Sequence, residues 1–265
     1  MSARHLPLLL LVLAGCRRGE DTSALLTDAR QRLAARDGKL TSYVLAGTAR
    51  EAGQRLDFRF AYRAPQKMLG TLGTPAVRAF AWDGEHLYER DDTARKFRTY
   101  DGRLGDGGLG NGGLGPEERA GVLTGLFAPF APEGFRVPLL PGQGVSARRT
   151  PHPRGPEAVE LTVKPAGTDV EVTYVLRWPA MDFLGKRTRS GEDTAELRVE
   201  EEHCEQALGL CVPKRLTQWG GGQQVAETSL TRVELNPALP AETFSLSAPG
   251  GYDVETKTLA ALGGR

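Results

Sequence analysis

The residues whose spacing most directly indicates a reaction are two cysteines in the last quarter of the chain. Cys204 and Cys211 flank a short segment, 205–210, between two runs that are typical of β-strands. In an oxidising compartment, thiols placed in this way form a disulfide that clamps a hairpin. Metal binding is the alternative, but His203 is the sole additional His or Cys nearby, and a metal site needs more ligands. We therefore predict a disulfide between Cys204 and Cys211 and no metal site.

Histidines and carboxylates, the usual acids and bases of catalysis, form no recognisable constellation. His86, His152 and His203 lack zinc-binding spacing, and no Gly-x-Ser-x-Gly nucleophile motif is present. The acidic run 200–202 is typical of a solvated strand end rather than of a catalytic pair. We expect no enzyme activity, no catalytic residues and no cofactor. An esterase or glycan hydrolase stays the alternative, because catalytic groups that assemble in space leave no mark on residue order.

The N-terminus carries a third cysteine, in a context that indicates lipid attachment. Arg4 precedes the apolar run 6–13, which is too short to span a membrane, and Leu-Ala-Gly-Cys16 follows. This end resembles the bacterial lipobox, which implies cleavage before Cys16 and lipidation of its sulfur and its new amino group. We expect a signal peptide over 1–15 and a lipidated tether over 16–22. An ordinary signal peptide with an incidental cysteine is the alternative.

The residues after Cys16 indicate which membrane would hold the anchor. They are Arg17 and Arg18, whereas Gram-negative lipoproteins that are retained at the inner membrane carry Asp there. The resemblance therefore predicts the outer membrane, with the protein facing the periplasm. Several acyl chains would anchor it stably, because each buried CH₂ contributes about 0.8 kcal/mol.

A glycine-rich loop occupies residues 102–115 and contains a G-x-G-x-x-G frame that starts at Gly105. No parallel βαβ unit surrounds this frame, so a dinucleotide site is disfavoured. A calcium-binding glycine repeat is weak too, because Asp106 and Asn111 are its sole side-chain ligands. The pattern favours a mobile connection. A sharper hypothesis places three apolar tips on a flexible lip: Leu104, Leu109 and Leu114.

Composition limits the classes of partner and fold. The 265 residues carry a formal net charge of +1, which gives no electrostatic basis for binding nucleic acid. The 33 glycines and 17 prolines predict many turns, which suit short strands better than long helices. No change in composition marks a domain boundary, so residues 23–265 are expected to form one domain.

Alternation of apolar and polar residues predicts the elements that position these groups. Residues 55–63 read R-L-D-F-R-F-A-Y-R, the period-two pattern of a half-buried antiparallel strand. A meander continues from it, with a hairpin turn at Asp83-Gly84. The other strands of this meander are predicted at 40–50, 66–72, 76–82, 85–90 and 95–100.

The remaining elements are mostly strands. Amphipathic helices are predicted at 23–36 and 116–130, and a terminal helix at 254–262. Residues 131–156 are rich in Pro and Gly and read as a long loop or a lightly structured insertion. Further strands are predicted at 158–164, 169–178, 181–189, 194–204, 211–219, 224–235 and 242–247.

The number of strands predicts the shape of the fold. A sheet of about ten strands curls because its twist accumulates, and two or three helices cannot cover its concave side completely. The predicted fold is mainly β with α: a single strongly curved antiparallel sheet, an unclosed half-barrel, with a few helices acting as a lid. An apolar hollow of this kind suits an acyl chain. A closed sandwich or barrel with a filled core is the alternative.

Three stretches of the sequence resemble one protein superfamily. A helix leads through 40–43, L-T-S-Y, into a strand; 58–65, F-R-F-A-Y-R-A-P, is followed by 82–88, W-D-G-E-H-L-Y; and 233–236 and 242–251 close the chain. These stretches are similar to those of Lol-type periplasmic lipoprotein carriers and outer-membrane lipoprotein receptors. The resemblance implies an unclosed antiparallel half-barrel with helices as a lid over an apolar cavity for acyl chains.

The resemblance also implies roles for particular residues. The carriers have an Arg directly before the Pro of the strand-end motif, whereas here Ala64 intervenes, so Arg63 is the counterpart for a possible gating role. The receptor carries an exposed Leu on a protruding loop. The insertion 131–156 and the cysteine pair have no counterpart, which indicates a divergent relative. The expected lid and loop residues are Leu109, Leu114, Leu126 and Phe127. The last two belong to the predicted helix 116–130, whose apolar surface is either a lid over the sheet or plain core.

From these patterns we expect an outer-membrane lipoprotein that binds an acyl chain or the lipid of a lipoprotein, in lipoprotein or lipid transport or insertion. Its expected partners are that lipid, the membrane through the anchor, and a periplasmic carrier protein. The alternative is an envelope-stress sensor or protein-interaction module of the same fold. The candidate ligand-binding residues are Leu56, Phe58, Phe60, Phe80, Val172, Tyr174 and Leu176.

Overall fold

A computed structural model describes residues 22–73, 75–102, 115–136, 144–153, 155–164 and 167–263. The predicted signal peptide, Cys16 and most of the tether lie outside the described residues. So do most of the glycine-rich loop, Leu109 and Leu114. Among the described helices, none is both long enough and apolar enough to cross a membrane.

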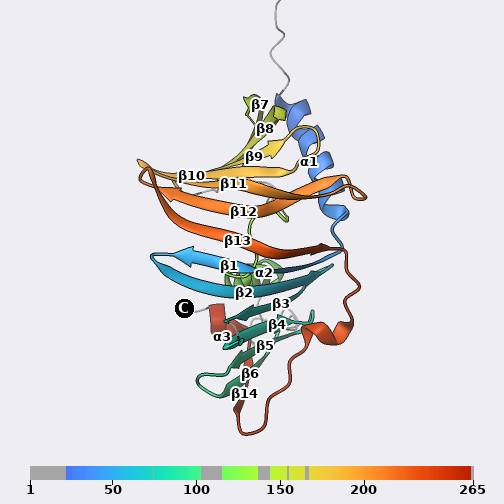
Figure 1. The fold of residues 1–265 in the computed structure, drawn as a ribbon, viewed down its shortest axis with the longest axis vertical. Helices are drawn as coiled ribbons and strands as arrows, with labels where there is room; N and C mark the ends of the chain where they lie inside the picture. Colours follow the sequence, from blue (N-terminus) through green and yellow to red (C-terminus); the bar gives the residue numbers. More distant parts are fainter. Residues whose placement is uncertain are drawn as a thin grey trace, which may run out of the picture.

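The described residues form one curved sheet of fourteen strands, which is not closed into a barrel (Figure 1). Its spatial order is β14-β6-β5-β4-β3-β2-β1-β13-β12-β11-β10-β9-β8-β7, so β14 and β7 are the two edges. This confirms the predicted unclosed half-barrel. In chain order the strands are β1 (Ser42–Glu51), β2 (Gln54–Arg63), β3 (Lys67–Leu72), β4 (Arg78–Trp82), β5 (His86–Asp91), β6 (Lys96–Asp101), β7 (Gly144–His152), β8 (Gly155–Lys164), β9 (Val170–Arg177), β10 (Phe183–Ser190), β11 (Asp193–Glu205), β12 (Leu210–Gly220), β13 (Gln223–Leu235) and β14 (Asp253–Thr258).

Local sequence explains the meander from β1 to β6. Phe58 and Phe60 of β2 are buried, as the alternation predicts. Asp83 holds the turn between β4 and β5, because its Oδ1 accepts hydrogen bonds from the backbone N–H groups of Glu85 and His86. Gly84 adopts a φ of 112° there, which a residue without Cβ tolerates. The hairpin predicted at Asp83-Gly84 is therefore confirmed.

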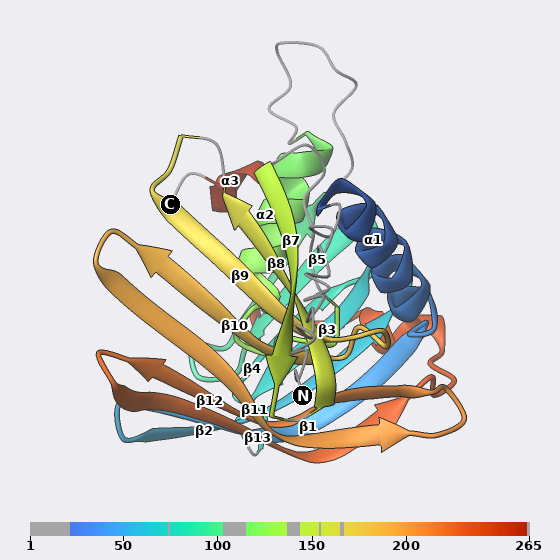
Figure 2. The same cartoon turned by 90° about the horizontal axis from the view of Figure 1, so that it is seen from above.

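Helix α1 (Thr22–Gly38) lies on the concave side of the sheet (Figure 2). It buries Leu25, Ala29 and Leu33, which recur at helical spacing, against apolar residues of β7 to β12. Leu161 of β8 and Leu176 of β9 are fully buried in this contact. This half of the concave face is therefore filled by α1.

Helix α2 (Pro116–Phe127) covers the other half of the concave face, over β1 to β6. Leu123 and Phe127 are buried against that part of the sheet. The chain after α2 adds Phe130, whose ring lies on Gly70 of β3, where an added Cβ would come within 2.6 Å of the ring. Phe135 completes this second core cluster.

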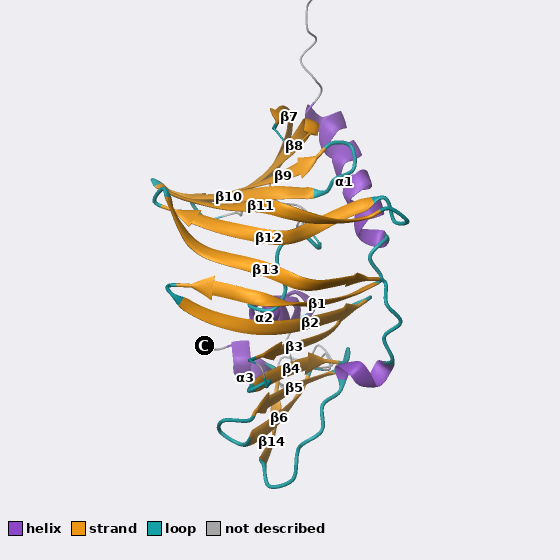
Figure 3. Cartoon of the chain, viewed as in Figure 1, coloured by secondary structure: helices purple, strands orange, loops and turns teal. Residues whose placement is uncertain are grey.

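Three parts of the sequence fold differently from the prediction (Figure 3). The insertion 131–156 contains an edge strand, β7, although Pro and Gly surround it. Residues 242–247 form no strand: a 3₁₀ helix, η1 (Ala241–Phe244), starts after Pro240 and buries Phe244. Residues 254–262 give strand β14 and only a short helix, α3 (Ala260–Gly263).

Strand β14 pairs with β6 in parallel, so the sheet is antiparallel except at this edge. Its sequence, D-V-E-T-K-T, alternates β-branched residues with charged ones, which suits an exposed edge strand better than a helix. The chain reaches this edge through residues 236–252, which run past the meander (Figure 1). The sheet therefore gains a charged strand that comes from the far end of the sequence.

The cysteine pair lies at directly opposite positions of β11 and β12. Cys204 and Cys211 form a disulfide with a Cα–Cα distance of 4.0 Å. The predicted hairpin clamp is therefore confirmed. The Cys211 backbone N–H also donates a 2.9 Å hydrogen bond to Asp182, which ties the clamp to the chain just before β10.

Candidate functional site

The sequence-predicted binding residues do not gather in one place. Phe58, Phe60 and Phe80 belong to the cluster beneath α2, and they are at most 7% exposed. The predicted lid residues share that cluster: Phe127 is buried within it and Leu126 packs against it. On this side, predicted sheet and lid residues therefore pack as core.

The remaining predicted binding residues lie elsewhere. Leu176 is fully buried in the cluster beneath α1, and Tyr174 packs against that cluster. Val172 is half-buried, near the start of the same strand. Leu56 is 38% exposed and lies near the start of β2. Alternation along a strand assigns a residue to a face, but it does not tell which helix covers that face.

Arg63 holds the end of β2 to the segment before η1. Its guanidinium donates a hydrogen bond to the Leu239 carbonyl and lies over the Phe244 ring, 5.4 Å from the centroid. These contacts are with the segment that follows β13. The described contacts of Arg63 include none with α2.

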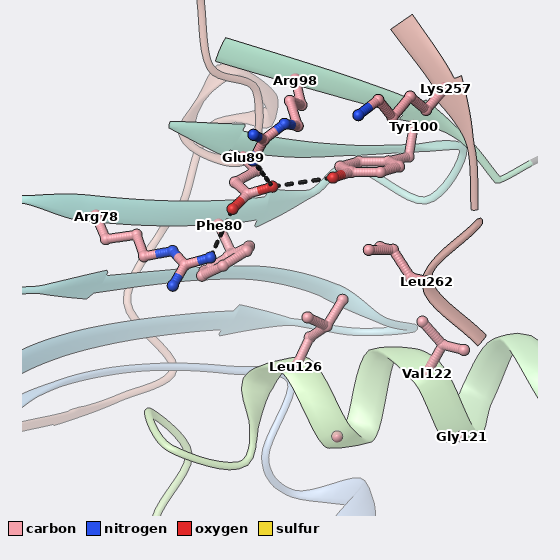
Figure 4. A pocket seen from close by; sticks show the side chains of 11 residues that line it. Arg78, Phe80, Glu89, Arg98, Tyr100, Gly121, Val122, Leu126, Lys257 and Leu262 are labelled. Carbon is pink, nitrogen blue, oxygen red and sulfur yellow. Dashed lines mark hydrogen bonds and ion pairs between the residues drawn. The ribbon is translucent and has the colours of Figure 1, made fainter. Parts of the chain in front are cut away.

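A cavity of about 830 Å³ lies between α2 and strands β4, β5 and β6 (Figure 4). Strand β14 and helix α3 complete its wall. Figure 4 shows the polar side chains on the sheet side and the apolar side chains of α2 and α3 opposite. The residues that line the cavity are Arg78, Phe80, Glu89, Arg98, Tyr100, Gly121, Val122, Gly125, Leu126, Lys257 and Leu262.

The α2 wall of the cavity is apolar, and there is unfilled space beside two of its residues. Val122 and Leu126 face it, while Leu123 and Phe127, one residue further along, hold the helix to the core. Gly121 and Gly125 lie one turn apart, and an added Cβ at either position would meet nothing within 4 Å. The two glycines therefore leave open space along one side of α2.

The four charged residues of the sheet wall form, together with Glu255 beside them, a row that alternates in sign across four strands and is here called the charge ladder. Its members, in order, are Lys257, Glu255, Arg98, Glu89 and Arg78. Glu255 accepts from Lys257 at 2.6 Å and from Arg98 at 3.1 Å. Glu89 accepts from Arg98 at 3.0 Å and from Arg78 at 2.7 Å. Cross-strand register produces this order, since Glu89 lies opposite Arg98, and Arg98 opposite Glu255.

The buried centre of the charge ladder is Glu89, which is only 4% exposed. Its Oε2 also accepts a 2.9 Å hydrogen bond from the Tyr100 hydroxyl. Burial on its own raises the pKa of the Glu89 carboxyl, but hydrogen bonds from two guanidinium groups and this hydroxyl outweigh burial and lower the pKa. Glu89 is therefore a fixed anion that holds Arg78 and Arg98 in place.

Sequence reasoning identified Phe80 and Leu126 in this cavity but missed its charged residues. One signal was present: Glu89 follows Leu87 at a spacing of two, so it shares the inward side of its strand. A carboxylate at an apolar position of the pattern indicates a buried partner of opposite charge. In the part of the chain that the structure describes, no three His, Cys, Asp or Glu side chains are grouped to hold a metal ion.

The fold and the cavity define a class: an open half-barrel whose helices lie over a hollow on the concave face. No protein-family model and no curated protein matches the sequence. A DUF1329 family protein from Desulfovibrio piger is structurally similar, with a TM-score of 0.56 and 8% identity over 84% of this chain and 97% of that one. A LolA superfamily protein from Nitrosomonas europaea has a TM-score of 0.50 and 11% identity over 82% of this chain and 97% of that one.

The chain thus has a LolA-like fold, as the sequence resemblance implies. MucB in the MucA/MucB complex of Pseudomonas aeruginosa has 15% identity over 84% of this chain and 61% of that one. Its TM-score of 0.31 is too low to carry an argument about this chain. At such identities the likeness concerns the fold alone.

Proposed function

We propose that this protein is a non-enzymatic, lipid-anchored protein of the bacterial envelope that holds an acyl chain in the cavity beside α2. The observation that carries the proposal is the cavity of about 830 Å³ on the concave face, with an apolar helix on one side. Its size is within the range of about 300–1,000 Å³ that ligand pockets occupy. Each CH₂ that it buries contributes about 0.8 kcal/mol.

The position of the cavity supports a binding role rather than a gap in packing. Leu123 and Phe127 fix α2 to the sheet, so the space beside Gly121 and Gly125 is not removed by a closer approach of the helix. The carboxylate that lines the cavity, Glu89, has a lowered pKa and accepts hydrogen bonds from three side chains. Both properties make it a poor general base. The proposed role therefore includes no catalytic step.

Binding is tested with delipidated protein and dodecanol, a neutral single-chain probe, by native mass spectrometry and titration calorimetry. We expect one bound chain per protein. Gly125→Leu places an isobutyl group in the open space beside α2 and should abolish binding while keeping the fold. Thr124→Leu, at an exposed position of the same helix, is the matched control and should bind as the wild type does.

The outcome also separates the proposal from its alternative. Dodecanol binding that Gly125→Leu leaves intact would show that the chain lies elsewhere. An empty protein that takes up no acyl probe and copurifies with a partner protein would favour an interaction module of the same fold.

The anchor is proposed on the sequence Leu-Ala-Gly-Cys16, with Arg17 and Arg18 after it. These residues support lipidation at Cys16 and a place at the outer membrane, facing the periplasm. Mass spectrometry of the mature N-terminus should find Cys16 as the first residue, carrying acyl chains. Cys16→Ser should abolish acylation and release the protein from the membrane fraction, and an unmodified Cys16 in the wild type would refute the anchor.

A further inference from the structure

We propose that the cavity selects a single-chain amphiphile with an anionic head group. The head group lies against the charge ladder, whose more exposed ends are Arg78 and Lys257, and the chain lies along α2. This inference rests on the proposed acyl-chain binding and adds the chemistry of the head group. Its basis is the charge ladder, of which Arg78, Glu89, Arg98 and Lys257 line the same cavity.

The two ends of the charge ladder differ from its centre. Arg78 and Lys257 each have one carboxylate partner, whereas Arg98 between them contacts two. The end side chains are 47% and 43% exposed, against 21% for Arg98 and 6% for Glu89. Arg78 and Lys257 therefore have N–H groups that can donate to a ligand. The N–H groups of Arg98 are instead paired with Glu89 and Glu255.

The charge balance of the cavity also favours an anion. Three cations and two carboxylates in the charge ladder leave one net positive charge beside an apolar wall. Glu89 is not available to pair with a cationic ligand, because it is buried and already accepts three hydrogen bonds. An anionic head group is attracted by both end cations and gains a charge-assisted hydrogen bond from the one that it reaches, whereas an ammonium group is repelled by both.

The apolar groups lie where the chain of such an amphiphile would run. Phe80, Leu126 and Leu262 line the same cavity as the two end cations. Gly121 and Gly125 line this cavity too, and an added Cβ at either position would meet nothing within 4 Å. A polar wall facing an apolar one fits a molecule with both characters and does not fit a fully apolar guest.

The test compares four probes of equal chain length by calorimetry at low ionic strength: dodecanoate, monododecyl phosphate, dodecanol and dodecylammonium. We expect both anions to bind at least about tenfold more tightly than dodecanol, and dodecylammonium to bind more weakly than dodecanol. The two anions distinguish a carboxylate from a phosphate head group. The preference should shrink as salt is added, because the end cations are partly exposed.

Two variants locate the effect. Arg78→Met and Lys257→Met should each reduce the ratio of dodecanoate affinity to dodecanol affinity severalfold, and together they should abolish the preference for anions. The matched controls are Arg148→Met and Lys164→Met, which remove an exposed Arg and an exposed Lys that also pair with a glutamate on the sheet. Circular dichroism checks folding, and Arg78→Gln or Lys257→Gln replaces the corresponding Met variant if that variant does not fold.

Each result decides between the two proposals. Equal binding of dodecanoate and dodecanol to the wild type would overturn the head-group inference and leave acyl-chain binding in place. A preference for anions that persists in the double variant would overturn the placement at Arg78 and Lys257. If no probe binds, the acyl-chain proposal itself fails.

Discussion

The guanidinium of Arg36, in the last turn of α1, donates a 2.9 Å hydrogen bond to the carbonyl of Phe135, which lies 99 positions further along the chain. The same group donates to the carbonyls of Gly134, at 2.9 Å, and Cys211, at 3.4 Å. Arg36 is only 2% exposed. One buried side chain thus joins α1, the segment after α2 and the disulfide hairpin.

Replacing Arg36 should therefore loosen all three parts. Arg36→Met keeps the apolar stem but leaves buried carbonyls without donors, so we expect a loss of about 3 kcal/mol in the free energy of unfolding. Urea denaturation measures it. Arg30→Met, at an exposed position of the same helix, is the control and should change stability by less than about 0.5 kcal/mol. Equal stability of the two variants would contradict this role of Arg36.

Glycine substitutions should have opposite effects at two positions, in β3 beneath Phe130 and within α2. Gly70→Ala places a methyl group within 2.6 Å of the Phe130 ring and should cost about 1–3 kcal/mol through overpacking. Gly121→Ala meets nothing within 4 Å and removes a flexible residue from a helix, so it should stabilise by about 0.5–1 kcal/mol. Thermal denaturation of both variants provides the comparison. A destabilised Gly121→Ala would show that the space beside α2 is filled.

Stability in acid should depend on Glu89. Its pKa is lowered in the folded protein, so the stability it contributes is present above the ordinary pKa of about 4.5 and is lost as the pH falls from there through the folded-state pKa. Glu89→Gln should be about 1–3 kcal/mol less stable than the wild type at neutral pH. The difference should narrow below about pH 4.5.

Denaturation at a series of pH values measures this difference. Glu85→Gln, an exposed residue of the turn before the same strand, is the control and should follow the wild type throughout. A difference between Glu89→Gln and the wild type that stays constant from neutral pH into acid would contradict the paired, ionised state of Glu89.

The disulfide should contribute to stability but not to binding. Cys204 and Cys211 are separated by 7 positions, and closing so short a loop stabilises by about 2.5 kcal/mol in the chain-entropy treatment. The double variant Cys204→Ser/Cys211→Ser should lose about this amount in urea denaturation and keep its affinity for dodecanol. Reduction of the wild type should give the same loss, whereas loss of ligand binding in the double variant would tie the clamp to the cavity.

The sequence predicted the elements whose signals are local. Alternation located β2, helical spacing located α1, and the turn at Asp83-Gly84 placed β4 next to β5. Strand β7 was missed because Pro and Gly surround it, and β14 because its apolar continuation, from Leu259 onward, favours a helix. Both missed strands are edges, where burial leaves the weakest pattern.

The candidate site could be predicted only in part, because pairing across strands is not a local property. Phe80 and Leu126 carry the apolar pattern of their own elements, and both line the cavity. Arg98 and Glu255 meet although 157 positions separate them, through a parallel strand that the pattern does not reveal. The charge ladder therefore required the register of the sheet.

The place of β1 between β2 and β13 has a consequence for how the chain is made. Residues 42–51 can pair with 54–63 once both have been synthesised, but their other neighbour, 223–235, follows much later in the chain. Until it arrives, β1 presents an unpaired row of backbone groups next to exposed aromatic residues, a template for joining other chains. A chaperone that shields the unpaired edge of β1 would thus raise the yield of folded protein. Moving 223–235 ahead of β1 by circular permutation would lessen the need for that chaperone.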